Sequence, residues 1–572
     1  NVVYFRHLPG ELQLQINLRY KNLEYGIDRD FNFSRSMDED VSVWIARIKN
    51  NFQKEFEKKF NKKRKKKKDA AEQEGPTTEI PEISVQLLEN NSAIHDRTFA
   101  DILKGKNEKS KDLFLEIIKE KYEVSYNAPY VANLALPSSI LANFFVYPSK
   151  LELQFAKREL SKFLWFRGKM PESKNEKMIS WEQVHEGIIY KSQTDDIGHH
   201  LKLQCIPSNG QSEGAIAEYM SKCEVQAGPG NCPFESRHAF TSHKLCRRKF
   251  RVISYNILAD LYADSEFTRK ELFPYCPAYA LNIDYRKQLY LKEIIGYNSD
   301  IICLQEVDAK IFVLDLVPML DLHNFKGTFQ MKGTSGEGIA TFYDQNRFEL
   351  VSKYGMTIGE NIPKNPIFGD LWNKIKDNAK LIERITEIST ALQVTLLKSR
   401  ETENYLLIAN IHLYFAPDAD HIRLLQIGFS MAYIQHLYEL TLQEQKLEKD
   451  KLSIIFCGDF NSVPQCGIYK LLTEKYVPEK FVDWLSNQEE AVKNVSLNQP
   501  FNIESACGCP KYTNFTVGFA DCLDYIFYQT DNLTVEEVIP LPSEEELTAY
   551  TAIPSVVFPS DHVALVADLR WK

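Results

Sequence analysis

Five short polar motifs constrain this chain most, because each follows a strand-like apolar run within residues 248–572. They are Ser254-Tyr255-Asn256, Leu304-Gln305-Glu306, Ala409-Asn410-Ile411-His412, Gly458-Asp459-Phe460-Asn461 and Ser560-Asp561-His562. Open α/β architectures gather such polar strand ends at one edge of a sheet. We therefore expect the five motifs to meet in space and to form one polar site.

The motif side chains are of the kinds that hold a hard divalent cation beside a phosphodiester. Glu306 and Asp459 offer anionic oxygens, and Asn461 and Asp561 offer further oxygen ligands. Mg²⁺ prefers oxygen ligands of this kind and keeps some of its waters. We expect Glu306 to be the main ligand, with the other three nearby, and Mn²⁺ to be able to replace Mg²⁺.

The remaining polar groups suit the hydrolysis of a phosphodiester. Asn256, His412 and His562 can stabilise the charge that grows on the phosphate oxygens in the transition state. Asp524, in Cys522-Leu523-Asp524-Tyr525-Ile526, can accept a hydrogen bond from His562 and hold its ring in one tautomer. We expect Asp459 to orient or deprotonate the attacking water, while the choice between an aspartate and a histidine as general base stays open.

Each motif taken alone has a simpler interpretation. A Gly-Asp turn after a strand is commonly a loop or a helix cap, and a single histidine is commonly a core or surface residue. The complete set, in this order and at strand ends, is far more specific and indicates metal-assisted hydrolysis.

The motif order resembles the exonuclease-endonuclease-phosphatase family, whose catalytic domain is a DNase-like four-layer α/β sandwich. Further motifs are similar to the deadenylase branch of that family: Asn256-Ile257-Leu258-Ala259-Asp260, Tyr275-Cys276-Pro277, Asp284-Tyr285-Arg286 and Tyr512-Thr513-Asn514. Val538 to Ser543 and Leu569 to Lys572 are similar to one member of that branch in particular. The resemblance implies a Mg²⁺-dependent phosphodiesterase and 3′-exoribonuclease that hydrolyses 2′,5′-oligoadenylate and poly(A) tails and releases 5′-AMP.

The same resemblance implies substrate-binding residues and a partner. Phe519 matches the aromatic residue on which the branch stacks a terminal adenine, although core packing is the competing interpretation. Asn514 and Arg286 lie in shared motifs and are expected to bind substrate. RNA is the expected partner. The resemblance also implies the mitochondrial matrix, with any targeting peptide lying outside this chain.

Length and composition predict about three domains with packed cores, since the chain has 572 residues, of which 44% are hydrophobic. We expect a mainly β N-terminal region at residues 1–143, because Leu12 to Leu18 alternates with the period of a half-buried strand. Residues 144–225, with Trp165 as a candidate core residue, resemble an immunoglobulin-like β-sandwich. Residues 226–247 are predicted to be a linker, and residues 248–572 the catalytic domain.

The formal charge of −9 is unevenly distributed along the chain. Lys58 to Lys68 contains nine basic residues, so the rest of the chain carries −18. The run can be a solvated linker, a nuclear address or a tether for RNA or anionic membrane, and the loop-like residues that follow favour a flexible insertion near residues 58–80. No apolar run reaches the length of about 18 residues that a membrane helix needs, since Pro137 interrupts Val131 to Tyr147, and we expect no membrane insertion.

Three other functions are consistent with parts of the pattern. A sphingomyelinase-type phosphodiesterase shares several motifs but would need an exposed apolar loop or membrane helix, and none is evident. An endonuclease for abasic DNA would need a basic duplex-binding face, which the −18 remainder opposes. A non-catalytic RNA-binding module would be expected to have lost at least one catalytic group.

Overall fold

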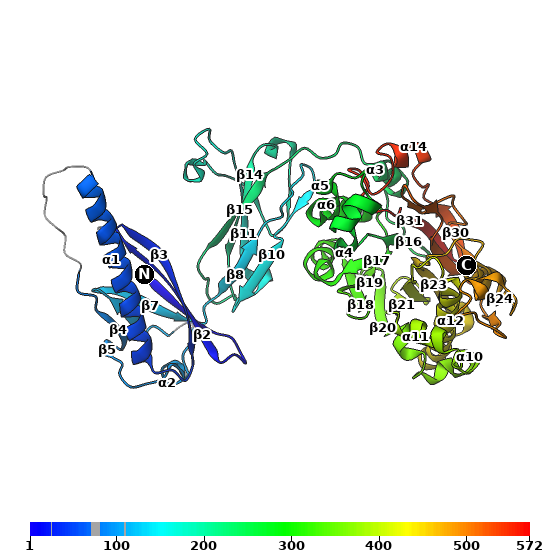
Figure 1. Cartoon of the computed structure of the whole chain (residues 1–572), viewed down its shortest axis with the longest axis horizontal. Coiled ribbons are helices and arrows are strands. Elements are labelled where there is room, and N and C mark those ends of the chain that lie inside the picture. The colour runs from blue at the N-terminus through cyan, green and yellow to red at the C-terminus, as the bar shows by residue number, and fades with distance from the viewer. Residues whose placement is uncertain (24–25, 70–80, 108–109) are drawn as a thin grey trace. The chain divides into compact units, whose positions relative to one another are not determined.

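Two units make up the computed structural model, which describes residues 1–23, 26–69, 81–107 and 110–572 (Figure 1). The first unit contains residues 1–136, 150–190 and 200–222, and the second contains residues 137–149, 191–199 and 223–572. The predicted catalytic region therefore shares its unit with two short segments from earlier in the chain. Among the described residues, none of the helices combines the length and the apolar composition that crossing a membrane requires.

The first unit begins with a seven-stranded sheet of order β3-β2-β1-β7-β6-β4-β5. Its strands are β1 (Val2–His7), β2 (Gln13–Asn22), β3 (Ile27–Ser36), β4 (Val85–Glu89), β5 (Ser92–Ala93), β6 (Leu113–Ile117) and β7 (Glu120–Tyr126). Within β2, Leu14, Ile16 and Leu18 are buried while Gln13, Gln15 and Arg19 are exposed. The strand predicted from the period-two alternation is thus confirmed.

Helix α1 (Val41–Asp69) contributes to the core of this first sheet. Trp44, Ile48, Phe52 and Phe56 are all fully buried and recur at helical spacing. The helix runs through residues 58–69, which the composition predicted to be part of a flexible insertion. That part of the prediction is wrong, because lysine and arginine are good helix formers and a packed helix adds one hydrogen bond per further residue. Residues 70–80 lie outside the described residues.

The rest of the first unit is antiparallel β structure. Strands β8 (Tyr130–Ala135) and β10 (Lys150–Gln154) pair with each other. A four-stranded sheet of order β12-β11-β14-β15 is built from β11 (Lys162–Gly168), β12 (Glu182–Glu186), β14 (His200–Ile206) and β15 (Ala217–Glu224). Trp165 is fully buried, and its indole N–H donates to the carbonyl oxygen of Gly187 at 2.9 Å. The N-terminal region is therefore mainly β, with Trp165 in its core, as predicted.

The segment predicted to be a linker, residues 226–247, packs on the second unit instead. Helix α3 (Pro233–Arg237) ends in Arg237, which is buried and donates to the carbonyl oxygens of Pro540 and Ala564 at 2.8 Å each. Glycine and proline at Gly228, Pro229 and Gly230 are typical of a linker, but the helix that follows them is part of the folded unit. Residues after Gly230 therefore belong to the body of the second unit.

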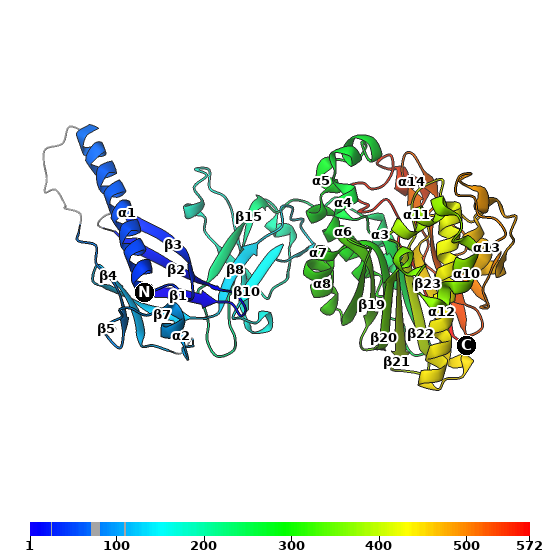
Figure 2. The ribbon, with the colours of Figure 1, turned by 60° about the horizontal axis from the view of Figure 1, so that its bottom comes forward.

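The second unit is built on two six-stranded sheets that pack face to face, as Figure 2 shows. The first has the order β18 (Phe325–Met331), β19 (Glu337–Asp344), β17 (Ile301–Asp308), β16 (Lys249–Asn256), β31 (Leu565–Trp571), β30 (Leu533–Val538). The second has the order β20 (Phe348–Thr357), β21 (Ala391–Ser399), β22 (Tyr405–His412), β23 (Leu452–Asp459), β29 (Asp524–Gln529), β26 (Ile503–Ser505). Val252, Cys303, Ile408 and Cys457 belong to the apolar core that they share.

Helices cover the outer face of each sheet. Helices α6 (Ile283–Gly296), α7 (Ala309–Ile311) and α8 (Val317–Asp321) lie on one side, and α10 (Gly369–Ile375) and α12 (Asp420–Gln445) lie on the other (Figure 2). Ile422, Leu425 and Phe429 recur at helical spacing in α12 and are fully buried. The unit is therefore the four-layer α/β sandwich that the sequence predicted.

Candidate active site

Two pairs of parallel strands bring four of the predicted residues together at their carboxyl ends. In the first sheet, β16 and β17 pair with Asn256 opposite Gln305, next to Glu306. In the second sheet, β22 and β23 pair with His412 opposite Asp459. A hydrogen bond of 3.0 Å from the Asn256 amide to Asp459 joins the two sheets at this edge. The polar strand ends meet, as the motif order predicted.

Asn256 holds the two carboxylates rather than facing open space. Its amide nitrogen donates to Glu306 Oε1 at 3.1 Å and to Asp459 Oδ2 at 3.0 Å. Its side-chain oxygen accepts from the backbone N–H of Leu258 at 3.0 Å, and the residue is 1% exposed. The side-chain amide of Asn256 is therefore engaged by protein groups and, contrary to expectation, is not free to contact a phosphate. Instead, Asn256 fixes the spacing between Glu306 and Asp459.

Glu306 is presented by an irregular stretch of β17. The pairing of β17 with β19 shifts register between Leu304 and Val307, and Glu306 itself has a φ of 54°. Left-handed backbone at a residue other than glycine is costly and tends to occur at functional sites. The carboxylate accepts from the N–H of Ala259 at 3.0 Å. Burial, together with the charge of Asp561, raises the pKa of Glu306 to about 7.

Asp459 ends β23 and is almost completely buried. Its Oδ1 accepts from the N–H of Asn461 at 2.9 Å, and the side chain of Asn461 donates to the carbonyl oxygen of Leu413 at 2.9 Å. Burial and the neighbouring Asp524 raise the pKa of Asp459 to about 6. Two acidic groups with raised pKa values thus share one amide donor, an arrangement that a bound cation would stabilise.

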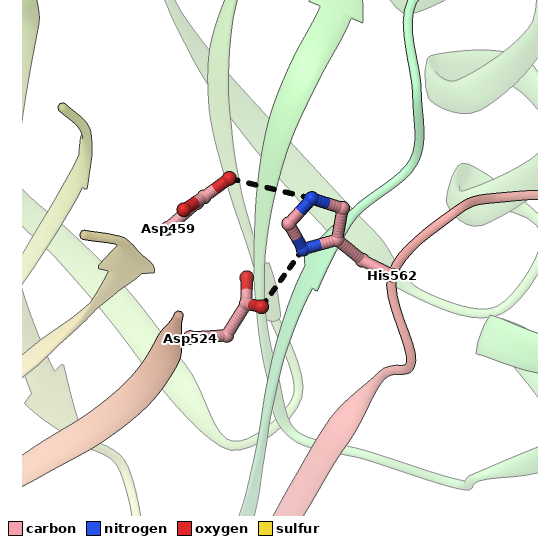
Figure 3. Close-up of side chains that lie close together, drawn as sticks. All are labelled: Asp459, Asp524 and His562. Atoms are coloured by element: carbon pink, nitrogen blue, oxygen red, sulfur yellow. Dashed lines mark hydrogen bonds and ion pairs between the residues drawn. The ribbon is translucent and has the colours of Figure 1, made fainter. Parts of the chain in front are cut away.

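His562 lies between Asp459 and Asp524, as Figure 3 shows. Its Nδ1 lies 2.8 Å from Asp524 Oδ2, and its Nε2 lies 3.5 Å from Asp459 Oδ2. The hydroxyl of Thr513 donates to the same Asp524 oxygen at 2.6 Å. Burial alone lowers the pKa of His562, but the carboxylates of Asp524, Asp459 and Asp561 outweigh it and raise this pKa well above its usual value. Asp524 therefore lies where it can hold the ring in one orientation, and this role stays a prediction.

Asp459, Asp524 and His562 also form a group whose potential ligand atoms all lie within 4.8 Å of one another. A cation bound through Nδ1 of His562 would displace the proton that joins this nitrogen to Asp524, because the nitrogen lies at hydrogen-bond distance from the carboxylate. Glu306 and Asp459 offer carboxylate oxygens without this competition. The pair Glu306 and Asp459 is the better cation site on this ground.

His412 is the second histidine of the site and lies close to both acids. Its Nε2 is 3.6 Å from Asp459 Oδ2 and 4.0 Å from Glu306 Oε1. Burial, with the nearby positive charge of Lys332, lowers the pKa of His412 well below its usual value. His412 is thus the neutral histidine of the site, whereas His562 is the charged one.

A cleft of about 1000 Å³ opens above these groups. Of the predicted residues, Glu306, His412, Asp459, Asn461, Asn514, Phe519, Asp561 and His562 line it. Asn514 contacts two other predicted site residues, because its backbone bridges to His562 and its amide donates to Asp561 at 3.3 Å. Phe519 is 45% exposed, so the competing interpretation of Phe519 as a core residue does not describe its environment.

Arg286 does not line the cleft, and the prediction that it binds substrate is wrong for this structure. Its side chain is fully buried in α6. The guanidinium donates to the carbonyl oxygens of Leu258 at 2.8 Å, Ile257 at 3.2 Å and Pro559 at 3.2 Å. Arg286 therefore ties together the loops that follow Asn256 and precede Asp561.

Three residues of the cleft or its support were not predicted. Thr513 lies in the motif Tyr512-Thr513-Asn514, but its hydrogen bond to Asp524 is visible only in the folded structure. Lys332 lies in the loop between β18 and β19 and lines the cleft. Phe415 follows His412 by three positions and also lines the cleft. An aromatic residue so close to a catalytic motif was the available signal.

Comparisons with known proteins agree with this architecture. The model for the "2',5'-phosphodiesterase 12-like, N-terminal domain" matches residues 128–226, and the model for the "Endonuclease/Exonuclease/phosphatase family" matches residues 253–562. The chain is similar to 2',5'-phosphodiesterase 12 of Homo sapiens, with 42% identity over 476 residues that cover 80% of this chain and 76% of that protein. The Rattus norvegicus protein of the same name is 41% identical over the same shares.

A more distant relative is the CCR4-Not complex 3'-5'-exoribonuclease subunit Ccr4 of Schizosaccharomyces pombe. It is 29% identical over 357 residues, which cover 57% of this chain and 49% of that protein. The motif order, the four-layer sandwich and the family match lead to the same conclusion. This chain belongs to the endonuclease/exonuclease/phosphatase family.

Proposed function

We propose that the chain is a divalent-metal-dependent phosphodiesterase that removes 5′-AMP from the ends of 2′,5′-oligoadenylate and of 3′,5′-poly(A). Membership of a family of hydrolytic enzymes supports the reaction class. The observation that carries the proposal is the pair of buried carboxylates, Glu306 and Asp459, which share the Asn256 amide at 3.1 and 3.0 Å beside the Asp524 and His562 pair.

Mg²⁺ is the proposed ion, and Mn²⁺ can replace it. The donor set supports a hard cation, since Glu306 and Asp459 offer carboxylate oxygens and Asn461 and Asp561 line the same cleft. The raised pKa values of Glu306 and Asp459 support this proposal, because burial disfavours the ionised carboxylates and a cation would offset that cost. When bound, a divalent cation supplies positive charge to the phosphate oxygens and makes water more acidic.

His562 and Asp459 have opposite roles in proton transfer: His562 donates a proton and Asp459 accepts one. His562 is held protonated by its neighbouring carboxylates, so it donates from Nε2 to a phosphate oxygen rather than accepting a proton from water. Asp459, with a pKa of about 6, is ionised at neutral pH and accepts a proton. We therefore favour Asp459 as the general base. Neutral His412 donates a hydrogen bond without adding charge.

Two observations support adenylate substrates: the names of the relatives and the exposed aromatic ring in the cleft. The relatives carry the names 2',5'-phosphodiesterase and 3'-5'-exoribonuclease. Phe519 presents an exposed ring on the cleft that also holds Asp459, which suits a stacked terminal base. RNA ends are therefore the proposed partner.

One assay tests the reaction and the substrate together. The protein is incubated with Mg²⁺ and, in parallel, 2′,5′-triadenylate, 3′,5′-oligoadenylate, an abasic duplex or sphingomyelin, and 5′-AMP is quantified by chromatography. We expect 5′-AMP from both oligoadenylates, and its loss after chelation or in Glu306→Gln. Turnover of the abasic duplex or sphingomyelin alone would overturn the proposed substrate class.

The mitochondrial matrix is a separate proposal that rests on the family resemblance. Expression of the natural full-length protein with a C-terminal fluorescent tag, followed by matrix protease-protection, tests it. Sensitivity of the tag to protease in intact mitochondria, or its absence from them, would contradict it.

A further inference from the structure

The aromatic ring of Phe415 is exposed inside the catalytic cleft and has no role in the proposed chemistry. It is 72% exposed, more than any other large apolar residue that lines the cleft. Single exposed apolar residues are common on protein surfaces. Phe415 differs because its ring lines the same cleft as Glu306 and Asp459 and follows His412 by only three positions.

The backbone that carries Phe415 is held on both sides. Arg423, which is 4% exposed, donates to the carbonyl oxygen of Tyr414 at 2.9 Å and to that of Ala416 at 2.6 Å. The ring of Tyr414 lies 5.4 Å from that of Phe415 at an interplanar angle of 60°. A ring on a fixed backbone loses little conformational entropy when a ligand stacks on it. The backbone that presents the exposed ring is thus preorganised.

Phe415 and Phe519 are carried by two different structural elements that line the site. Phe415 follows β22, whose last residue His412 pairs with Asp459. Phe519 lies in the turn between β27 (Asn514–Phe515) and β28 (Ala520–Asp521), and Asn514 bridges to His562. The two rings therefore line one cleft from separate elements, as a site for two adjacent nucleosides requires.

The charge of the cleft makes stacking important for affinity. Among its described lining residues, Lys332, Arg423 and the charged His562 supply positive charge, against the acidic residues Glu271, Glu306, Asp420, Asp459 and Asp561. The guanidinium of Arg423 is occupied by Tyr414, Ala416 and Asp420. Few phosphate charges can thus be neutralised by the protein, so contacts to the bases must supply more of the binding energy.

We propose that Phe415 is a specificity-determining residue that stacks the base of the nucleoside leaving the scissile phosphate, while Phe519 takes the base of the released 5′-AMP. This inference rests on the proposed function. In that reaction water attacks phosphorus, the bond to the 2′ or 3′ oxygen of the leaving nucleoside breaks, and that oxygen gains a proton. Phe415 takes no part in these bond changes and acts by positioning the leaving group.

Two dinucleotide substrates distinguish stacking of the leaving base by Phe415 from a general contribution of Phe415 to activity. The first is adenylyl-adenosine, and the second has the same linkage and the same leaving ribose but no base on the leaving side. For Phe415→Ala we expect kcat/KM on the first to fall by about 5- to 150-fold, the range of one lost base stack. On the second substrate the variant should match the wild type, because that substrate has no base to stack.

Rescue and control variants complete the test. Phe415→Trp should retain discrimination in favour of the dinucleotide with two bases, and Phe415→Leu should not, since leucine keeps apolar area without a flat π-face. Phe267, a phenylalanine that is 62% exposed and does not line the cleft, is the matched control, and Phe267→Ala should behave as wild type.

The outcomes distinguish this proposal from the proposed function. Equal losses on both dinucleotides, or no loss on either, in Phe415→Ala would overturn the role of Phe415 while leaving oligoadenylate hydrolysis intact. Failure of the wild-type protein to release 5′-AMP from adenylyl-adenosine and from longer oligoadenylates would overturn the proposed function itself.

Discussion

The buried Asp524 carboxylate accepts two hydrogen bonds on one oxygen, from His562 Nδ1 at 2.8 Å and from the Thr513 hydroxyl at 2.6 Å. This pairing keeps the His562 ring in the orientation that directs Nε2 toward Asp459. Asp524→Asn should therefore lower kcat by about 100-fold or more with little change in KM, because the amide cannot support the charged ring.

Steady-state kinetics of Asp524→Asn, His562→Gln and the double variant test this pairing. The double variant should lose much less than the product of the two single losses, as groups acting as one unit do. Thr513→Val, which removes the second hydrogen bond and leaves the charge, is expected to have a smaller effect. A change confined to KM in Asp524→Asn would contradict the orienting role.

Glu306→Gln should abolish most activity without unfolding the protein. The substitution removes a proposed ligand from a strand end, and we expect kcat/KM to fall by about 100-fold or more. In the absence of metal its Tm at pH 8 should equal or exceed that of the wild type. The pKa of Glu306 is raised to about 7, so ionisation of this buried acid costs stability as the pH rises through that value.

Differential scanning fluorimetry with and without Mg²⁺ checks the role of Glu306. The wild type should gain Tm with added Mg²⁺ and Glu306→Gln should gain much less. Equal metal-induced stabilisation of the two proteins would show that the ion binds elsewhere.

Phe519→Ala should separate recognition of adenine from phosphodiester cleavage. We expect kcat/KM on oligoadenylate to fall by the equivalent of about 1–3 kcal/mol, the value of one stack, because the exposed ring lines the cleft. Hydrolysis of a base-free activated phosphodiester should barely change. Parallel losses on both substrates together with a lower Tm would assign Phe519 to the core.

Arg286→Lys should affect stability before it affects substrate affinity. The guanidinium donates to carbonyl oxygens of Ile257, Leu258 and Pro559, and a lysine cannot reach all three. We expect a loss of about 2–4 kcal/mol in the free energy of unfolding, measured by urea denaturation. A variant of native stability with a raised KM would restore the original interpretation of Arg286 as a substrate ligand.

Asp483→Asn should stabilise the protein at neutral pH. Asp483 is buried and accepts from the N–H of Gly467 at 2.6 Å, and burial raises its pKa to about 6. An acid whose folded pKa lies above its unfolded value contributes stability at low pH that is lost as the pH rises through the folded pKa.

The asparagine cannot ionise, so its advantage should appear between about pH 4 and 7 and reach at most about 3 kcal/mol. Urea denaturation across this range measures it. Asp450→Asn, at a side chain that is 65% exposed, is the control and should show no such trend. A constant difference between Asp483→Asn and the wild type at all pH values would contradict this assignment.

The sequence located the site because its residues stand where strands end. Glu306 and Asp459 follow buried runs, and parallel pairing brings such ends to one edge. The motif order could not reveal the direction of a side chain. Arg286 lies in a motif that is similar to the deadenylase branch, but its side chain is buried partly against Pro559, which lies far along the chain.

Local composition also could not predict the structure of segments whose conformation depends on packing against the rest of the chain. The lysine-rich residues 58–69 were expected to be flexible, and the helix that contains them is anchored by Trp44 and Phe56. Phe415 could be read as one more apolar residue after a strand. Its exposure follows from the way Arg423 holds the loop, which no sequence pattern indicates.

Strand β31 lies between β16 and β30 in the first sheet and comes after every catalytic motif in the chain. A chain that stops before residue 565 therefore leaves β16, the strand that carries Asn256, with a bare hydrogen-bonding edge. Unpaired edges promote association with other chains. Premature termination near the end of translation should thus produce an aggregation-prone polypeptide rather than a weakened enzyme, so that quality control, not residual catalysis, decides the fate of the shortened product.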